Sequence, residues 1–147
     1  SQVFARRMIS QAVEDGREDA PVGSIINLSS IAARRAQTDL MAFSVSSAAC
    51  DQMTRSLAVA LAPERIRVNA IAFGSVMSES LKGILKEHPD FRDEIVKSTP
   101  LARIAGAAEL GEVAQFLASD GSGFMTGQVL TIDGGRTLVD PVHVSAH

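Results

Sequence analysis

One run of apolar and β-branched residues, SIINLSS at 24–30, limits the folds open to this chain more than any other feature. It is short, it follows Gly23, and its apolar residues are consecutive rather than alternating, which is typical of a strand buried on both faces. RIRVNAIAF at 65–73 predicts a second strand, and QVLTIDGG at 128–135 predicts a third that closes on two glycines.

Apolar residues at helical spacing lie between the predicted strands. A first helix is expected at 2–15, ending at Gly16, with a stripe formed by Phe4, Met8, Ile9, Ala12 and Val13. A long helix is expected at 43–61, before Pro63, with a stripe formed by Ala49, Met53, Leu57, Ala60 and Leu61. Pro89 divides the charged region 81–98 into two short helices. The segment 108–120 predicts an amphipathic helix with one apolar side formed by Leu110, Val113, Ala114 and Leu117.

Strands that alternate with helices favour an α/β fold with a parallel sheet and right-handed crossovers. Three strands make a thin sheet, however, and a parallel strand buried on both faces is not expected at an open edge. We therefore expect a further strand beside residues 25–28, for which this chain supplies no candidate. That strand would belong to a second polypeptide or to a part of the protein outside these 147 residues.

Charge and composition argue against several classes of partner. The formal net charge is −3, there is no basic block, and Trp and Tyr are absent, so no nucleic-acid partner is expected. No apolar run reaches the roughly 18–20 residues of a transmembrane helix, and no membrane association is expected. Cys50 is the only cysteine, which excludes an internal disulfide and fits a cytoplasmic protein; we expect a small buried thiol.

Four segments agree in order and spacing, which is more than one short motif supports. They are GSIINLSS at 23–30, FSVSSAACDQMTRSLAVALAPERIRVNAIAFGSV at 43–76, PLARIAGAAELGEVAQFLASD at 100–120 and GFMTGQVLTIDGG at 123–135. Together they resemble the short-chain dehydrogenase/reductase family, and more closely its branch of 3-oxoacyl-carrier-protein reductases.

This resemblance implies the C-terminal half of a doubly wound, Rossmann-type α/β fold, with three strands and flanking helices. The chain would form one partial domain over 1–147, with a tail at 136–147. The family's first half holds the glycine-rich dinucleotide loop and the residue that selects NAD or NADP, and no such loop occurs in this sequence. NAD or NADP is the implied cofactor, but not as a ligand of this chain alone.

The resemblance also assigns three catalytic positions. Hydride transfer to a ketone leaves an alkoxide that must be protonated. The family uses a tyrosine for this step, a lysine that lowers the tyrosine pKa, and a serine that polarises the carbonyl oxygen. Here the serine is Ser30, but Phe43 stands at the tyrosine position and Ser47 at the lysine position. General acid–base assistance is worth roughly 100- to 10,000-fold, so the usual reaction is expected to be impaired. Ser30 could equally serve only to bond local backbone.

The turn after the second strand is where the family meets the nicotinamide. The resemblance therefore assigns cofactor contacts to Gly74, Val76 and Ser78, although Phe73 replaces the family's usual proline. Asn69 and Asp133 are expected to bond nearby backbone and to support the fold rather than the chemistry.

Other residues that could replace the missing groups have simpler interpretations. Arg34 and Arg35 could touch a substrate acid, and Asp39 could act as a base, but solvated loop charges are the commoner case. The histidines lie in a charged loop and in the tail, at His88, His143 and His147. The last two have a spacing that could hold a metal, but a fraying terminus is the simpler interpretation, and no metal site is predicted.

Three hypotheses follow. The chain is part of an NAD(P)-dependent oxidoreductase acting on a carbonyl or alcohol, impaired as described. Alternatively, it is a non-catalytic subunit that supports an active relative in a mixed oligomer. A third hypothesis is another reaction in the same pocket that needs no tyrosine. The resemblance implies homo- or hetero-oligomer contacts through the first helix and the Phe43–Leu61 helix, and a complementing N-terminal half is a further expected partner.

Overall fold

The computed structural model describes residues 2–17, 19–36 and 38–140. The three strands are β1 (Gly23–Ser30), β2 (Ile66–Phe73) and β3 (Val129–Ile132). The helices are α1 (Gln2–Glu14), α2 (Met41–Leu61), α3 (Glu79–Glu87), α4 (Phe91–Lys97) and α5 (Ala107–Ala118). Short 3-10 turns join them: η1 (Ile31–Arg34), η2 (Thr38–Leu40), η3 (Ala62–Glu64) and η4 (Asp120–Ser122).

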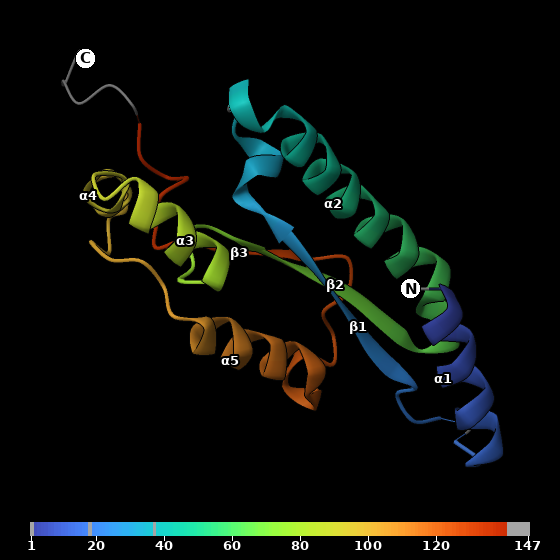
Figure 1. Cartoon of the computed structure of the whole chain (residues 1–147). Helices are drawn as coiled ribbons and strands as arrows, with labels where there is room; N and C mark the ends of the chain where they lie inside the picture. The colour runs from blue at the N-terminus through green and yellow to red at the C-terminus, as the bar shows by residue number, and fades with distance from the viewer. Residues whose placement is uncertain (1, 18, 37, 141–147) are drawn as a thin grey trace, which may run out of the picture.

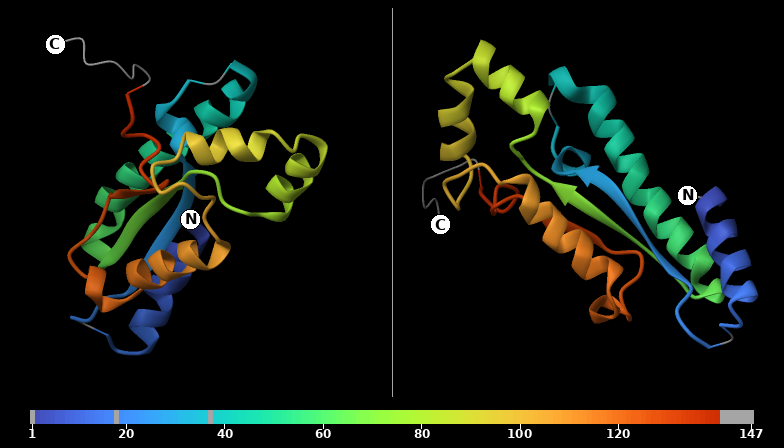
Figure 2. Two further views of the ribbon diagram at one scale, coloured as in Figure 1. Left: turned by 90° about the vertical axis from the view of Figure 1, so that its left-hand side faces the viewer. Right: turned by 60° about the horizontal axis from the view of Figure 1, so that its bottom comes forward.

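The strands form one parallel sheet in the order β1-β2-β3. Helices α1 and α2 cover one face of this sheet and α5 covers the other, so the chain has three layers (Figures 1 and 2). Helices α3 and α4 lie beyond the ends to which the strand arrows point (Figure 1). The expected α/β fold, with three parallel strands and flanking helices, is confirmed.

Residues on alternate positions of β2 serve the two faces of the sheet. Ile66 and Val68 pack with Ala5 of α1 and Ala58 of α2 to form the apolar core on one side. On the other side, the Arg67 guanidinium donates hydrogen bonds to the carbonyl oxygens of Leu117 and Ser119 and to the Ser122 hydroxyl, at 2.8–3.1 Å. Strand β2 therefore contacts α1 and α2 on one face of the sheet and the end of α5 on the other.

Asn69 and Asp133 bond the backbone as predicted. The Asn69 amide donates to the Met125 carbonyl at 2.8 Å and accepts from the Gln128 N–H at 3.0 Å, which fixes the segment leading into β3. The Asp133 carboxylate accepts from the N–H groups of Gly135 and Thr137, at 2.9 and 2.7 Å. These bonds close the turn in which Gly134 and Gly135 adopt positive φ angles.

The face that α2 turns toward the sheet differs from the predicted apolar stripe. Its buried residues are Ser47, Asp51, Thr54 and Ala58, whereas Met53 of the predicted stripe is 44% exposed. The cause is hydrogen bonding across the interface with β1. The Ser29 hydroxyl donates to the Asp51 carboxylate at 2.5 Å, and the Asn27 amide donates to the Thr54 hydroxyl at 2.9 Å. The spacing of apolar residues in the sequence does not indicate such polar contacts.

Smaller corrections concern α1 and the limits of the elements. In α1, Ala12 is buried as predicted, but Phe4 and Val13 are 67% and 76% exposed, and the small Ala5 is buried instead. The second strand begins after Arg65, whose left-handed backbone (φ 55°) ends the preceding turn. The last strand is shorter than predicted because its two glycines belong to the following turn. The break at Pro89 and the half-buried or buried side of the fifth helix agree with the prediction.

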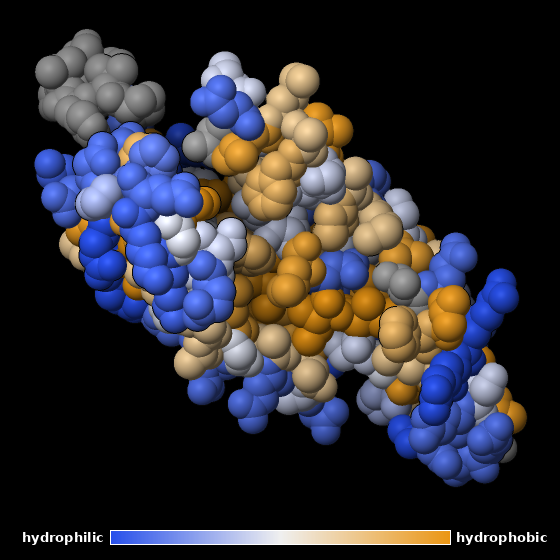
Figure 3. Space-filling model, viewed as in Figure 1, coloured by the Kyte–Doolittle hydropathy of each residue, from blue (hydrophilic) through white to orange (hydrophobic). Residues whose placement is uncertain are grey.

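The strand β1 lies at an edge of the sheet. Among the described residues, β2 is the only strand that pairs with it. The prediction that β1 is buried on both faces is therefore wrong for this chain: Leu28 is 65% exposed, and most of the strand is half-buried. Figure 3 shows hydrophobic residues gathered across the middle of the face where β1 lies in Figure 1. Of the helices in the described part of the chain, none has the length and apolar character to cross a bilayer.

Glu109 fixes the start of α5. Its carboxylate accepts two hydrogen bonds from the Arg103 guanidinium, at 2.6 and 2.7 Å, and one from the Gly106 N–H at 2.8 Å. The bonds from Arg103, followed by the bond from Gly106, lower the pKa of Glu109 to about 2 from its ordinary 4.5. Because the folded pKa is depressed, this carboxylate stabilises the fold above pH 4.5, and the contribution is lost as the pH falls toward 2.

The variant Glu109→Gln should therefore be less stable than the unaltered chain at neutral pH, and the difference should shrink between pH 4.5 and pH 2. Urea unfolding at a series of pH values measures it. Glu112→Gln on the same helix is the matched control and should stay close to the unaltered chain. A stability difference for Glu109→Gln that stays constant as the pH falls would contradict this account.

Ser29 and Asp51 are each 4% exposed, so their hydrogen bond lies in the interior. Ser29→Ala leaves the Asp51 carboxylate without this hydroxyl donor and should cost about 1–3 kcal/mol of unfolding free energy. The control Ser46→Ala removes an exposed hydroxyl of α2, the helix that carries Asp51, and should change stability by no more than about 0.5 kcal/mol. Urea unfolding of both variants measures the difference, and equal effects would refute the assigned role of the Ser29 hydroxyl.

Candidate functional site

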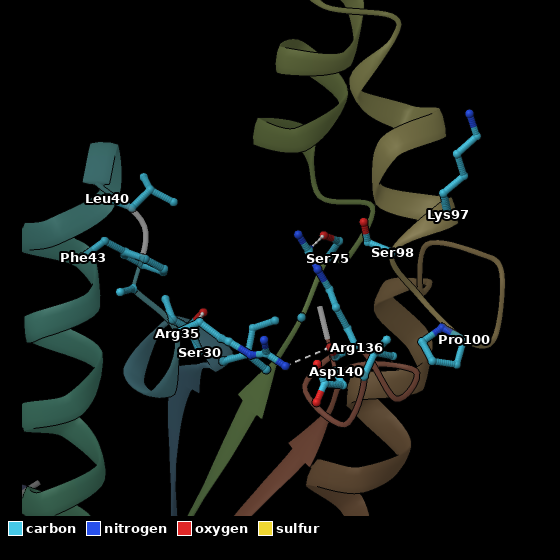
Figure 4. A pocket seen from close by; sticks show the side chains of 15 residues that line it. Ser30, Arg35, Leu40, Phe43, Ser75, Lys97, Ser98, Pro100, Arg136 and Asp140 are labelled. Carbon is cyan, nitrogen blue, oxygen red and sulfur yellow. Dashed lines mark hydrogen bonds between the residues drawn. The ribbon is translucent and has the colours of Figure 1, made fainter. Parts of the chain in front are cut away.

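The carboxyl ends of the three strands open onto one cavity of about 800 Å³. Ser30 ends β1 and Ile31 follows it, Gly74 and Ser75 follow β2, and Arg136 lies in the turn after β3. The start of α2 and the segment after α4 complete the walls (Figure 4). In a parallel α/β sheet, this is the edge where ligands bind.

Ser30 lies at the floor of the cavity and is 7% exposed. Its hydroxyl oxygen accepts a hydrogen bond of 3.2 Å from the Ala32 N–H, which caps the turn η1. The expected local backbone bond is therefore present. It uses an oxygen lone pair, so the hydroxyl proton remains available for an acceptor in the cavity.

Phe43 lies in the first turn of α2, lines the cavity and is 48% exposed. Ser47 follows one turn later, is 6% exposed and is not among the lining residues. Its hydroxyl donates to the Phe43 carbonyl oxygen at 2.8 Å, a bond within the helix. The structure thus brings Ser30 and Phe43 to one cavity, while Ser47 faces the sheet. The catalytic roles assigned by resemblance stay predictions.

The predicted cofactor turn follows β2 closely. Gly74 lines the cavity, and a Cβ atom there would lie 3.0 Å from Asp133 Cβ, so the two turns touch only because residue 74 is glycine. Val76 forms an isolated bridge with Ala105. The Ser78 hydroxyl accepts from the Leu81 N–H at 3.2 Å and caps α3. Of the three residues, Gly74 alone lines the cavity.

Of the other candidates, Arg35 lines the cavity, whereas Arg34, Asp39 and His88 do not. The His88 ring stacks on Phe91, with ring centres 4.6 Å apart. His143 and His147 lie outside the described residues. Within the part of the chain that is described, there is no group of three or more His, Cys, Asp or Glu side chains that could hold a metal ion.

Cys50 is half-buried rather than fully buried. Burial, followed by the neighbouring Asp51 carboxylate, raises the pKa of its thiol above the ordinary value. The thiol lies 3.6 Å from the Leu28 carbonyl oxygen and outside the cavity.

Sequence reasoning missed Arg136, which it assigned to a tail without pattern. Its guanidinium donates to the Ser75 hydroxyl at 3.0 Å, and its carbonyl oxygen accepts from the Arg35 guanidinium at 3.2 Å (Figure 4). Asp133, which was predicted to bond nearby backbone, could have indicated the position of Arg136. Its carboxylate accepts a hydrogen bond from the Thr137 N–H, so the turn after β3 includes Arg136.

Asp133 is close enough to Arg35 for the two charges to interact. Although partial burial raises its pKa, hydrogen bonds from Thr137 and Gly135 and the charge of Arg35 together hold the pKa of Asp133 below its ordinary value. The carboxylate is therefore ionised at neutral pH and offsets part of the positive charge beside it.

Comparison with known proteins gives this geometry a context. The family profile described as enoyl-(acyl carrier protein) reductase matches residues 3–137. Oxidoreductase UcpA of Salmonella typhimurium is 41% identical over 128 residues, which cover 83% of this chain and 49% of the relative. The 3-oxoacyl-acyl-carrier-protein reductase FabG of Chlamydia trachomatis is 35% identical over 113 residues, 77% of this chain and 44% of the relative.

A solved structure agrees with these relatives. The gluconate 5-dehydrogenase of Burkholderia cenocepacia, in complex with NADP and tartrate, matches with a TM-score of 0.82 at 31% identity, over 95% of this chain and 51% of that one. The chain spans about half the length of the relatives that it matches. The agreement of the family profile, the relatives and the fold shows that this chain belongs to the short-chain dehydrogenase/reductase family.

Proposed function

We propose that this chain is the substrate-facing half of an NAD(P)-dependent oxidoreductase acting on a carbonyl or alcohol, in which the proton-transfer pair has been replaced. The observation that carries the proposal is the position of the Phe43 ring on the same cavity as the Ser30 hydroxyl. Phe43 occupies the place where, by resemblance, a phenol would protonate the product. Phenylalanine has no proton to transfer.

Ser47 supplies no substitute for the lysine. A hydroxyl carries no positive charge, and this one is buried and bonded to the Phe43 carbonyl oxygen. Ser30 retains a proton with which to polarise a carbonyl oxygen, but polarisation alone does not deliver a proton to an alkoxide. Without both partners, turnover should fall by roughly 100- to 10,000-fold relative to an intact pair.

The turn after β2 fits the nicotinamide end of a dinucleotide. Gly74 brings the backbone of this turn to the cavity, and Ser75 lines the cavity beside it. Ser78 retains its hydroxyl proton, because it accepts rather than donates in capping α3. When bound, the dinucleotide supplies or takes the hydride. The glycine-rich loop for its phosphates does not occur in this sequence.

We propose that the nucleotide-binding half comes from outside these 147 residues. The outer edge of β1 pairs with no strand in the described residues, and Leu28 on this strand is 65% exposed. A parallel strand added there would pair with the backbone of β1 and bring its own carboxyl end to the cavity. The match to about half of each relative agrees with this arrangement.

A second candidate is a non-catalytic subunit that supports an active relative in an oligomer. The observation that favours it is the apolar surface on the two helices predicted to form contacts. On α1, Val3 and Phe4 are 79% and 67% exposed; on α2, Val45 and Val59 are 65% and 78% exposed. These exposed side chains are the ones that a contact through α1 and α2 would bury.

Restoring the pair tests the catalytic proposal. Phe43→Tyr with Ser47→Lys should raise hydride transfer from NADPH or NADH by on the order of 100-fold or more. Small ketones and β-ketoacyl thioesters serve as substrates. The gain should require a nucleotide-binding half, encoded in the same reading frame or added as a separate chain.

The matched control for this test is Phe124→Tyr with Ser46→Lys, which adds the same groups at exposed positions away from the cavity. It should give no gain. Robust turnover by the unaltered chain would refute the proposal that Phe43 and Ser47 impair catalysis.

Native mass spectrometry tests the oligomer. The unaltered chain should associate with itself or with a family member, and Phe4→Glu with Val59→Glu should weaken that association about tenfold or more, because burying one such side chain is worth ~1.5–3 kcal/mol. Phe124→Glu, at an exposed site outside α1 and α2, should leave association unchanged. A folded monomer that finds no companion would refute the second candidate.

A further inference from the structure

The cavity walls carry more positive than negative charge. Arg35, Lys97 and Arg136 line the cavity, against the single carboxylate of Asp140. Figure 4 shows the Arg35 side chain directed toward Arg136, while Lys97 lies at the rim and points away. The two arginines therefore form the cationic part of the interior.

Both guanidiniums are held in place by neutral partners. Arg136 donates to the Ser75 hydroxyl at 3.0 Å, and Arg35 donates to the Arg136 carbonyl oxygen at 3.2 Å. These bonds link the segments that follow all three strands. The arginines are thus fixed by the fold at the ligand-binding edge, rather than extended freely into solvent, and each is half-buried.

Within residues 2–17, 19–36 and 38–140, neither arginine forms a salt bridge. The salt bridges in the described residues join Arg17 to Asp15, Lys82 to Glu79 and Arg103 to Glu109. The charge of Arg35 helps to lower the pKa of Asp133, but the Asp133 carboxylate accepts its hydrogen bonds from the backbone of its own turn. Both guanidiniums are positively charged and line the same cavity, so an anion in that cavity would be attracted by both. Each also has donor groups in the planar geometry that suits a carboxylate or phosphate.

We propose that the cavity takes a small substrate bearing a carboxylate or phosphate, which Arg35 and Arg136 hold while its carbonyl or hydroxyl carbon faces Ser30. The orientation of the reacting carbon toward Ser30 rests on the proposed oxidoreductase function, whereas the binding of the anion does not. A cavity of about 800 Å³ is in the range of small-molecule sites.

Calorimetric titration of the chain with matched ligands tests this proposal. In the first pair, 4-oxopentanoate carries a carboxylate oxygen where hexane-2,5-dione carries a methyl group. In the second pair, dihydroxyacetone phosphate carries a phosphate that dihydroxyacetone lacks. At least one anion should bind roughly tenfold or more tightly than its neutral partner, because hydrogen bonds to charged groups are the stronger kind. Whichever pair shows the difference identifies carboxylate or phosphate. Equal affinities within both pairs, or no binding by any ligand, would overturn the proposal.

Three variants locate the anion. Arg35→Gln and Arg136→Gln should each abolish the preference for the anion, whereas Arg34→Gln, at the exposed neighbouring residue, should keep it. An equal loss in Arg34→Gln would overturn the assignment. The ligand comparison on the unaltered chain stands even if a variant fails to fold.

The two proposals fail separately. A preference for the anion without any hydride transfer, even after the pair is restored, would leave the anion site standing and remove the oxidoreductase. Turnover of neutral ketones without a preference for the anion would support the oxidoreductase and remove the anion site.

Discussion

The orientation of α2 depends on two buried hydrogen bonds between this helix and β1. Ser29 donates to Asp51 and Asn27 donates to Thr54, so the small polar side of the helix lies against the sheet. A half-turn of rotation would bury apolar side chains, but it would leave the Ser29 hydroxyl and the Asn27 amide without partners in the interior, at a cost of about 1–3 kcal/mol for each group. Both the position of Phe43 over the cavity and the exposure of Val45 and Val59 follow from this choice.

The cavity illustrates how a parallel sheet gathers distant residues. Ser30, Ser75 and Arg136 are far apart in sequence, yet each lies at or just beyond the end of a strand and all three line one cavity. Their alignment comes from the strand register, in which Ser30 lies opposite Phe73 and Phe73 lies opposite Ile132. The sheet determines only where the residues after each strand come together. The identity of those residues determines which reaction or ligand the edge can support.

Much of the fold was predictable because its signals are local. The apolar run at 24–30, Pro89 and the paired glycines at 134–135 each specify an element or a break within a few residues. The buried side of α2 was not predictable from its apolar stripe, because it depends on hydrogen bonds to a strand far away in sequence. For the site, sequence motifs pointed to Ser30, Phe43 and Gly74, which do line the cavity. Arg136 was missed because its position is set by Asp133, through a turn that has no helical or strand periodicity.

The outer edge of β1 has a consequence for how such a chain is made and handled. Its backbone N–H and C=O groups can pair with any extended segment of suitable shape, and Ile25, Ile26 and Leu28 give the strand an apolar middle. The hydrogen bonds that would admit a proper neighbour would equally admit a copy of the same strand. When the chain is made at high concentration, pairing of β1 with its proper neighbour therefore competes with pairing between copies of β1, which leads to aggregation. The faster of the two pairings determines the product.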